Sequence, residues 1–394
     1  MKLDADRWRA RRGVARILAA LGADEGLTRY VGGAVRDDLL QIPVNDIDFA
    51  TRLRPDEVVA RLEQAHIKAV PTGIAHGTIT AVADGQPAEI TTLRADVSTD
   101  GRRATVEFSD DWKADAARRD FTINALYADS RTGEIFDYFG GLDDIHARRV
   151  RFIGDPLQRI AEDHLRILRF FRFHARFGQG EPDAAALDAC TARANDLMAL
   201  SRERIADETA KTLGLPDPVA TVALMVERGI FLPVLPEITD AARLAALVTD
   251  EAAAKITPDA IRRLASLLPA DPAIADKVAA RLKLSKKARK RLAAAADSDL
   301  SANPRALAYW TGPETAIDRL LLARRPTDAA AIADWPVPRL PISGGKLIKL
   351  GLTEGPAVAS ALKAIDRRWV AAGFPDGAIF DTLVAEEIAR GVKR

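Results

Sequence analysis

The pattern of apolar residues changes near residue 150 of the 394-residue chain, and this change limits the folds available to it. Before that point, alternating and β-branched residues in VPTGIAHGTITAVADGQPAEITTLR (70–94) predict two short strands around an Ala-Asp-Gly turn. Residues 45–51 predict another strand, and residues 54–65 predict a helix with Pro55 in its first turn. We therefore predict an α+β region over residues 1–150.

Strand patterns are absent after this region. DPLQRIAEDHLRILRFFRFHARFG (155–178) predicts one long helix, with Asp155 as N-cap, Pro156 at the first position and Gly178 as the stop. Ala- and Leu-rich segments with helical spacing follow to the C-terminus, broken by Pro and Gly. The predicted fold class is thus α+β, with an N-terminal α+β domain followed by all-helical domains.

Composition excludes several classes of protein. The single cysteine, Cys190, excludes a disulfide framework and a cysteine-based zinc site, and it predicts a reducing, cytoplasmic location. No apolar run approaches about 20 residues, so we expect no membrane span. The net charge is +1, so a nucleic-acid surface would have to be a local patch. No residue pattern predicts a protein partner.

Asp46 and Asp48 form a D-x-D pair on the strand predicted over residues 45–51. Residues i and i+2 of a strand point to one face, where two carboxylates repel unless a cation lies between them. Carboxylates together with substrate phosphate oxygens are the usual ligands of Mg²⁺. Glu89, on a strand that can pair with this one, is the candidate third carboxylate. The alternative for all three residues is a solvated strand surface.

Gly32, Gly33 and Arg36 lie at the predicted start of a short helix. The exposed backbone N–H groups of a helix start bind phosphate, and an arginine one turn later adds a charged contact. The alternative is an ordinary helix start with a surface arginine.

Arg119 and Asp120 precede a predicted helix start at Thr122, in RRDFTINAL (118–126). Arg119 is a candidate to contact a triphosphate and Asp120 to contact a ribose hydroxyl. Asp120 can instead serve only as a helix N-cap.

Asp163 and Arg166 are three residues apart on the long predicted helix, so they share a face. A carboxylate and a guanidinium side by side can imitate a base edge and read a nucleotide base. Arg169 and Arg172 continue on the same side and can hold phosphates. The commoner alternative is an intrahelical ion pair, and nearby Phe173 reads as a core residue.

KVAARLKLSKKARKR (277–291) holds eight Lys or Arg residues and no acid. Phosphate contacts from such a run give nucleic-acid affinity without sequence readout. The alternative is a solvated basic helix face. The candidate RNA-binding residues in this run are Lys283, Lys286, Lys287, Arg289, Lys290 and Arg291.

Four motifs in order, GGAVRD, DIDFAT, RRDFTINAL and EDHLR, resemble those of the class II tRNA nucleotidyltransferases and bacterial poly(A) polymerases. The resemblance implies a nucleotidyltransferase-type head over 1–150, and a helical neck for base recognition over 151–215. It also implies a helical body over 216–335 and a helical tail over 336–394, both for RNA binding.

The resemblance further implies template-independent addition of nucleotides to an RNA 3′ end by two-metal transfer with pyrophosphate release. Asp46 and Asp48 would hold two Mg²⁺ ions, and either Asp48 or Glu89 would accept the proton. Gly33 and Arg36 would contact the triphosphate, Arg119 and Asp120 the sugar and phosphate. Asp163 and Arg166 would read C or A, and Arg169 and Arg172 would complete the pocket.

PTGIAHGT (71–78) and the D-G-R at residues 100–102 resemble passages of enzymes that add C, C and A to tRNA from CTP and ATP. Arg103-Ala104 departs from the His-Pro common after D-G-R. The alternatives are a poly(A) polymerase, a non-catalytic RNA-binding protein that kept the fold, and a nucleotidyltransferase acting on small molecules.

Overall fold

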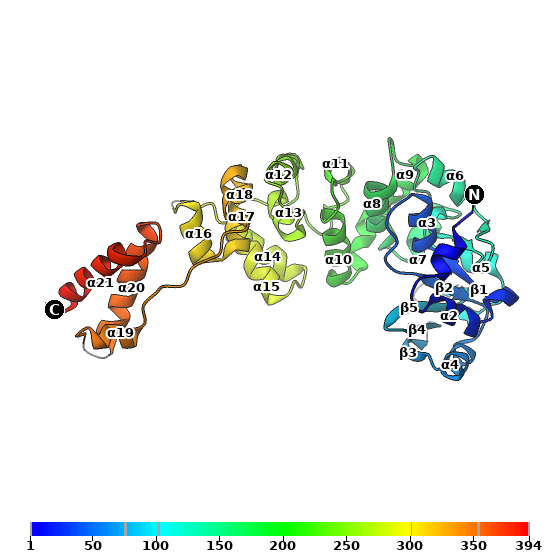
Figure 1. The fold of residues 1–394 in the computed structure, drawn as a ribbon. Coiled ribbons are helices and arrows are strands. Elements are labelled where there is room, and N and C mark those ends of the chain that lie inside the picture. The colour runs from blue at the N-terminus through cyan, green and yellow to red at the C-terminus, as the bar shows by residue number, and fades with distance from the viewer. Residues whose placement is uncertain (1, 75–76, 101–102, 301, 353–354, 393–394) are drawn as a thin grey trace. The chain divides into compact units, whose positions relative to one another are not determined.

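The computed structural model describes residues 2–74, 77–100, 103–300, 302–352 and 355–392. The chain divides into two compact units. Figure 1 labels the helices and strands that they contain. Unit 1 comprises Met1–Glu208 and Glu227–Val234, and unit 2 comprises Thr209–Val226 and Leu235–Arg394. The predicted division into head, neck, body and tail is finer than these two units, and it remains a prediction.

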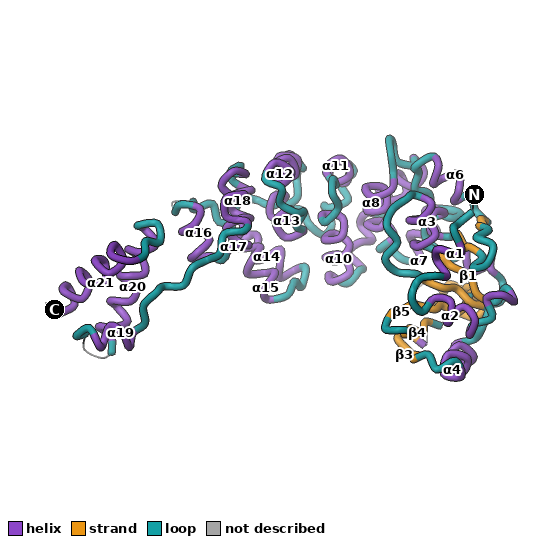
Figure 2. Tube along the Cα trace, viewed as in Figure 1, coloured by secondary structure: helices purple, strands orange, loops and turns teal. Residues whose placement is uncertain are grey.

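All strands of the described residues lie in unit 1, as the α+β prediction for residues 1–150 requires (Figure 2). A seven-stranded sheet has the order β3-β4-β5-β2-β1-β8-β9, in which β2 and β5 are parallel and the other neighbours antiparallel. Its strands are β1 (Thr28–Val31), β2 (Asp48–Thr51), β3 (Lys68–Gly73), β4 (Thr78–Ala83), β5 (Gln86–Thr92), β8 (Leu126–Ala128) and β9 (Ile135–Asp137).

The segment 70–94 carries one strand more than predicted, because β3 precedes the hairpin of β4 and β5. The predicted turn between β4 and β5 is confirmed. Asp84 and Gly85 both have positive φ, 52° and 80°, which suits a tight two-residue hairpin. Within PTGIAHGT, Ala75 and His76 lie outside the described residues.

A separate two-stranded ribbon joins β6 (Arg94–Asp100) and β7 (Arg103–Phe108). It occupies the segment that carries the D-G-R resemblance. Gly101 and Arg102 of that motif lie outside the described residues.

Helices surround the sheet and complete unit 1. The α-helices are α1 (Ala5–Arg9), α2 (Val14–Ala20), α3 (Gly33–Leu39), α4 (Pro55–Gln64), α5 (Trp112–Ala117), α6 (Gly141–His146), α7 (Pro156–Glu162), α8 (Arg166–Phe177) and α9 (Ala184–Ala192). The 3₁₀ turns are η1 (Ala23–Glu25), η3 (Thr122–Asn124) and η4 (Ala194–Ala199). Two helices, α10 (Arg202–Leu213) and α11 (Val219–Glu227), contribute residues to both units.

The prediction of one continuous helix over 155–178 was wrong. Asp155 caps α7 by accepting a hydrogen bond from the Gln158 N–H at 2.8 Å, and Gly178 ends α8, as predicted. Between the two helices, however, Asp163 adopts extended backbone (φ −151°, ψ 105°). Its carboxylate instead accepts from the Leu165 N–H at 3.1 Å, in the turn that starts α8. A short polar side chain that binds a nearby N–H competes with the helix in this way.

Two shorter elements also differ from the sequence prediction. The helix expected at Thr122 is only the single turn η3, after which the chain enters β8. The strand expected over 45–51 begins at Asp48, so Asp46 precedes it in a loop. The backbone before Asp48 is bound by a side chain and not by a neighbouring strand. The Arg11 guanidinium donates to the carbonyls of Val44 and Asn45 at 2.8 and 3.2 Å.

The regular elements among the described residues of unit 2 are all helices, joined by loops. Its own helices are α12 (Ala242–Ala253), α13 (Ala260–Leu267), α14 (Pro272–Arg281), α15 (Lys286–Ala295), α16 (Pro304–Thr311), α17 (Pro313–Leu322), α18 (Pro326–Ala333), α19 (Gly344–Lys349), α20 (Pro356–Ala371) and α21 (Gly377–Val392). One core contains Leu247, Leu320 and Ile332, and another contains Leu347, Ile365 and Trp369. None of the helices in the described part of either unit has the length and apolarity needed to cross a membrane.

A buried ion cluster joins the first helices of unit 2. Glu251 of α12 accepts from Arg262 and Arg263 of α13, each at 2.8 Å, and all three side chains are at most 3% exposed. Arg263 also donates to the backbone carbonyls of Leu213 and Pro216. The glutamate therefore neutralises two buried cations that fix the turn after α10.

We predict that Glu251→Gln destabilises the protein by about 3–5 kcal/mol, because it leaves buried guanidinium charge uncompensated. Thermal unfolding of the full chain would show this as a markedly lower midpoint. Asp276→Asn is the control, since its ion pair with Arg289 is exposed and exposed pairs contribute little to stability. Equal midpoints for the two variants would contradict the role given to Glu251.

Candidate functional site

Asp48 and Glu89 lie side by side at one end of the sheet, because β2 and β5 pair in parallel with these two residues in register. Asp46 lies two residues before Asp48, in the loop that leads into β2. The prediction that the Glu89 strand pairs with the Asp48 strand is therefore confirmed. Burial raises the pKa of Asp48 to about 6, and the neighbouring charges of Glu89 and Asp46 contribute to this rise.

The chemistry of this group fits a divalent cation. The charges of Glu89 and Asp46 both act on Asp48, so the three carboxylates form a concentration of negative charge, which a bound cation would relieve. In their present positions, the described residues include no three His, Cys, Asp or Glu side chains close enough to enclose a metal ion. Oxygens of a bound substrate would therefore have to complete the coordination sphere.

Gly32 and Gly33 form the start of α3, directly after β1 ends at Val31. Gly32 has a φ of 66°, a conformation that favours glycine, and a Cβ there would lie 3.3 Å from Arg119 Nη1. Glycine thus allows the backbone turn and the Arg119 guanidinium to approach each other. The predicted helix start with Arg36 one turn in is confirmed.

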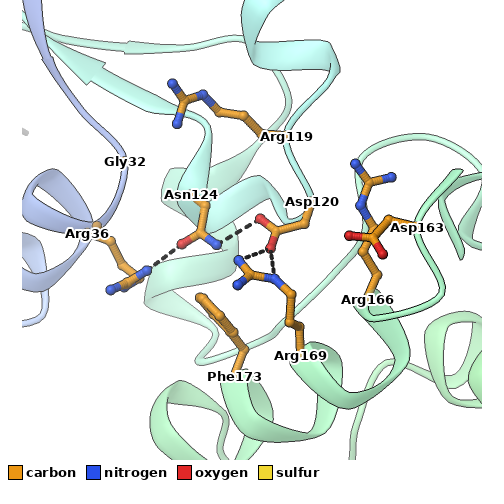
Figure 3. Close-up of a pocket in the computed structure, with 10 residues that line it drawn as sticks. Gly32, Arg36, Arg119, Asp120, Asn124, Asp163, Arg166, Arg169 and Phe173 are labelled. Atoms are coloured by element: carbon orange, nitrogen blue, oxygen red, sulfur yellow. Dashed lines mark hydrogen bonds and ion pairs between the residues drawn. The ribbon is translucent and has the colours of Figure 1, made fainter. Parts of the chain in front are cut away.

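A pocket of about 430 Å³ opens beside this turn, a size usual for small-ligand sites (Figure 3). Its lining brings together eight of the predicted residues and two others. The ten residues are Gly32, Gly33, Arg36, Arg119, Asp120, Asn124, Asp163, Arg166, Arg169 and Phe173. The three carboxylates Asp46, Asp48 and Glu89 adjoin the pocket through Arg119. This arginine lines the pocket, and its charge also acts on Asp48, where it counters the rise in the pKa.

Asp120 is the centre of a hydrogen-bonded network across the pocket floor (Figure 3). Its carboxylate accepts from the Phe121 N–H at 2.8 Å, from the Asn124 amide at 2.9 Å and from Arg169 Nε at 2.8 Å. Burial alone would raise the pKa of Asp120, but the Arg169 charge and these hydrogen bonds hold the pKa below its ordinary value. Asp120 is therefore not a helix N-cap; it is a buried anion that ties α8 to the sheet-bearing part of unit 1.

Arg36 joins the same network from the other side. Its guanidinium donates to the Asn124 side-chain oxygen, and its Nε donates to Asp37 at 2.8 Å. It also lies 4.1 Å from the centre of the Phe177 ring. Arg36 is 6% exposed and held by these contacts, so its positive charge has little freedom to move within the pocket wall.

Arg119 is held from behind by two groups. Its guanidinium donates to Asp115 at 3.1 Å and to the Tyr127 hydroxyl at 3.2 Å. Burial alone would raise the pKa of Asp115, but Arg119 and the Tyr127 hydroxyl hold that pKa below its ordinary value. The ionised Asp115 therefore orients Arg119 while part of the guanidinium still lines the pocket.

Asp163 and Arg166 both line the pocket (Figure 3). Their ion-pair partners are different residues. Arg166 donates to Glu162 at 2.6 Å, whereas Asp163 accepts from Arg204 at 2.8 and 3.1 Å. The alternative of an ion pair between Asp163 and Arg166 was therefore wrong, because each side chain pairs with another residue.

Arg172 does not line the pocket. It donates to the buried Glu208 at 2.6 Å and lies 4.6 Å from the centre of the Phe173 ring. Glu208 also lies 3.9 Å from Arg169, so one carboxylate neutralises both arginines. Arg172 is positioned to support the pocket from outside it.

Asn124 and Phe173 are pocket residues that sequence reasoning missed. Phe173 was assigned to the core, and it is indeed only 5% exposed, yet its ring also reaches the pocket. Asn124 lies inside the RRDFTINAL motif, and the only signal available was an amide four residues after Asp120. Four residues apart is the spacing at which its amide reaches the Asp120 carboxylate.

The basic run in unit 2 contains side chains of two kinds. Arg291 is 12% exposed and pairs with Asp318, Asp259 and Glu314 at 2.7–3.0 Å, which ties α15 to α17 and to the start of α13. Arg289 pairs with Asp276 at 2.5 Å. The five lysines of the run are exposed. Lys277 lies on α14, whereas Lys283, Lys286, Lys287 and Lys290 lie on or next to α15.

Comparison with known proteins identifies relatives for most of the chain. Residues 28–151 match the family described as "Poly A polymerase head domain". Residues 181–242 match the family described as "Probable RNA and SrmB- binding site of polymerase A". The first match contains the carboxylate group, the glycine turn, and Asp120 with Asn124, whereas Arg169 lies beyond it.

Relatives that match most of the chain are named as CCA-adding enzymes. Mouse (Mus musculus) mitochondrial CCA tRNA nucleotidyltransferase 1 is 34% identical over 88% of this chain and 83% of its own length. The CTP complex of the Bacillus stearothermophilus CCA-adding enzyme aligns with a TM-score of 0.75 and 27% identity, over 96% of this chain and 99% of that one. The Thermotoga maritima CCA-adding enzyme with tRNA shares the fold, at a TM-score of 0.69 and 19% identity. The chain belongs to the family of class II CCA-adding tRNA nucleotidyltransferases and poly(A) polymerases.

Proposed function

We propose that this chain adds C, C and A to the 3′ end of tRNA without a nucleic-acid template, using CTP and ATP and releasing pyrophosphate. One observation carries the proposal. A glycine turn, three arginines and the pair Asp163 and Arg166 share one pocket, and a group of three carboxylates adjoins it. The names of relatives that match over most of their length support the same activity.

Asp46 and Asp48 are the proposed ligands of two Mg²⁺ ions, with Glu89 beside them as the third carboxylate. When bound, Mg²⁺ would lower the pKa of the attacking 3′-hydroxyl and neutralise the triphosphate. The chain's own contribution is the pairing of β2 with β5, which holds Asp48 and Glu89 side by side before any ligand arrives. The backbone positions of these two carboxylates are therefore set by the sheet itself.

The glycine turn and the arginines are proposed to bind the triphosphate. The first N–H groups of α3 lack helical partners, so they can donate to phosphate oxygens, and Gly32 leaves room for close approach. Arg36 and Arg119 would add positive charge from two walls of the pocket. Asp120 and Arg169 are proposed to bind the ribose side of the nucleotide, and Arg172 to hold that arrangement through Glu208.

Asp163 and Arg166 are proposed to read the base. An ionised carboxylate only accepts hydrogen bonds, and a guanidinium only donates them. Cytosine and adenine both carry an exocyclic amino group that donates, next to a ring nitrogen that accepts. Asp163 beside Arg166 therefore complements C and A, whereas U and G present an oxygen where the amino group would be.

The lysines of α15 are proposed to contact the tRNA backbone. Arg291 is assigned instead to the packing of unit 2, because acidic side chains surround its guanidinium. The cytoplasmic location expected from the single cysteine is also a proposal, and the mouse and human relatives have names that place them in mitochondria.

The first prediction concerns the reaction itself. With tRNA that lacks its terminal CCA, we expect CTP alone to give addition of two residues and CTP with ATP to give three, after which addition stops. ATP alone should add little. Gel analysis of labelled tRNA distinguishes these products, and long A-tails from ATP alone would instead establish the poly(A) polymerase alternative.

The second prediction concerns Asp48→Asn. Nucleotide addition should be lost, because the proposed metal ligand is removed. Without metal, the variant should nevertheless be more stable than wild type above pH 6. We expect a difference of about 2 kcal/mol, because the pKa of Asp48 lies roughly two units above its ordinary value and solvent screens part of the effect. A folded-state pKa of about 6, above the unfolded value, penalises the ionised native state above that pH.

This stability difference should shrink as the pH falls from 6 and vanish below about 4, where Asp48 is protonated in both states. Thermal unfolding in a chelator, measured from pH 4 to 8, provides the test. Asp56→Asn, an exposed residue in the first turn of α4, is the control for general charge removal. A pH-independent difference would refute the electrostatic account of the carboxylate group.

The third prediction concerns the basic run. Lys286→Ala, Lys287→Ala and Lys290→Ala should each weaken tRNA binding. Each should also reduce the slope of log affinity against log salt by about 1, because one backbone phosphate is no longer neutralised by a lysine. Arg291→Ala should lower thermal stability, because it strips Asp318 of its partner. An unchanged salt slope in the triple lysine variant would remove α15 from the RNA surface.

A further inference from the structure

We propose that Arg204 is a positioning residue for base selection, acting through its ion pair with Asp163. This inference rests on the proposed function, since it concerns the base-reading group of that site. Arg204 belongs to α10, whose residues lie outside the lining of the pocket. Its effect on the reaction would therefore be exerted only by fixing where the Asp163 carboxylate points.

The geometry shows how the carboxylate is held. Arg204 Nη2 donates to Asp163 Oδ1 at 3.1 Å and to Oδ2 at 2.8 Å, and the Leu165 N–H donates to Oδ1 at 3.1 Å. Oδ1 thus accepts two hydrogen bonds and Oδ2 only one from the described residues. The Oδ2 atom is the one with accepting capacity left for a donor in the pocket.

The backbone at Asp163 explains why a second anchor matters. Because the helix breaks there, Asp163 has extended dihedrals and no regular helical packing to select one side-chain rotamer. The Leu165 N–H holds Oδ1 within the local turn but makes no contact with Oδ2. Arg204 adds the restraint on Oδ2, and it reaches Asp163 from 41 residues away in the sequence.

The position of Arg204 is itself fixed by α10. Glu208 lies one turn further along the same face and is 3% exposed. It accepts from Arg172 of α8 at 2.6 Å. One face of α10 therefore carries both a buried carboxylate that docks the helix against α8 and an exposed arginine that holds the base-reading carboxylate.

Energetics separate this role from a purely structural one. The side chains of Arg204 and Asp163 are 46% and 34% exposed, and exposed ion pairs contribute little to stability. The orientation of Asp163 should affect nucleotide choice more than the ion pair affects stability. A misplaced acceptor no longer distinguishes an amino group from an oxygen on the base. The pair is thus expected to matter for nucleotide choice far more than for folding.

The test compares wild type with Arg204→Ala and Arg204→Lys in the addition of C or U to tRNA that lacks CCA. For Arg204→Ala we expect the ratio of kcat/KM for CTP over UTP to fall about tenfold, mainly through KM for CTP, with a melting temperature within about 1 °C of wild type. Arg204→Lys keeps the charge and should recover part of the ratio.

The control is Arg325→Ala, which breaks the similarly exposed pair of Arg325 with Asp328 in unit 2, and neither of these residues lines the pocket. It should change neither the CTP preference nor the melting temperature. In an Asp163→Ala background, Arg204→Ala should have no further effect on nucleotide choice, because the residue through which it acts is gone.

Binding of CTP and UTP without tRNA, measured by calorimetry, separates this inference from the proposed function. A loss of CTP preference in Arg204→Ala would support the inference even if tRNA were not extended. An unchanged preference in both assays, or an equal loss in the Asp163→Ala background, would overturn it. A large fall in melting temperature with an unchanged preference would assign Arg204 to the fold alone.

Discussion

The buried carboxylate of Asp120 is the interaction on which the arrangement of the site depends. It accepts hydrogen bonds from Asn124, beside the sheet, and from Arg169 on α8, so it joins two elements that are distant in sequence. A buried charge needs such partners, because an unpaired one would cost several kcal/mol. The same contacts that satisfy Asp120 therefore place Arg169 in the pocket and, through Asn124, restrain Arg36.

Opposite charges are divided between the two parts of the site. Three carboxylates, Asp46, Asp48 and Glu89, form one part, and burial together with their mutual repulsion raises the pKa of Asp48. Arginines form the other part, each neutralised by an acid beside it, as Asp115 neutralises Arg119 and Asp120 neutralises Arg169. A nucleotide with its cations would fit this division, because the cations match the carboxylates and the phosphates match the arginines.

Much of the fold and most of the pocket could be predicted from local patterns. The Asp-Gly turn and the glycine helix start follow from short-range preferences, and both are present. The parallel pairing of the strands that carry Asp48 and Glu89 is a contact between distant segments, and it was predicted only because a third carboxylate was expected beside the other two. The break at Asp163 was missed, because periodicity cannot register a carboxylate that binds a nearby N–H in place of continuing the helix. Phe173 was assigned to the core alone, since sequence spacing does not tell which part of a buried ring meets a cavity.

The sequence by itself determined which residue types the site contains and in what order, because strand alternation, glycine placement and motif spacing are local properties of the chain. Only the tertiary structure decided the partner of each charge. Asp163 and Arg166 are near neighbours in sequence, yet their partners are Arg204 and Glu162. Arg291 belongs to a basic run, yet acids from α17 and from the N-cap of α13 surround it. Ion pairs form between side chains that folding brings within a few ångströms, and that proximity is not encoded in any single segment.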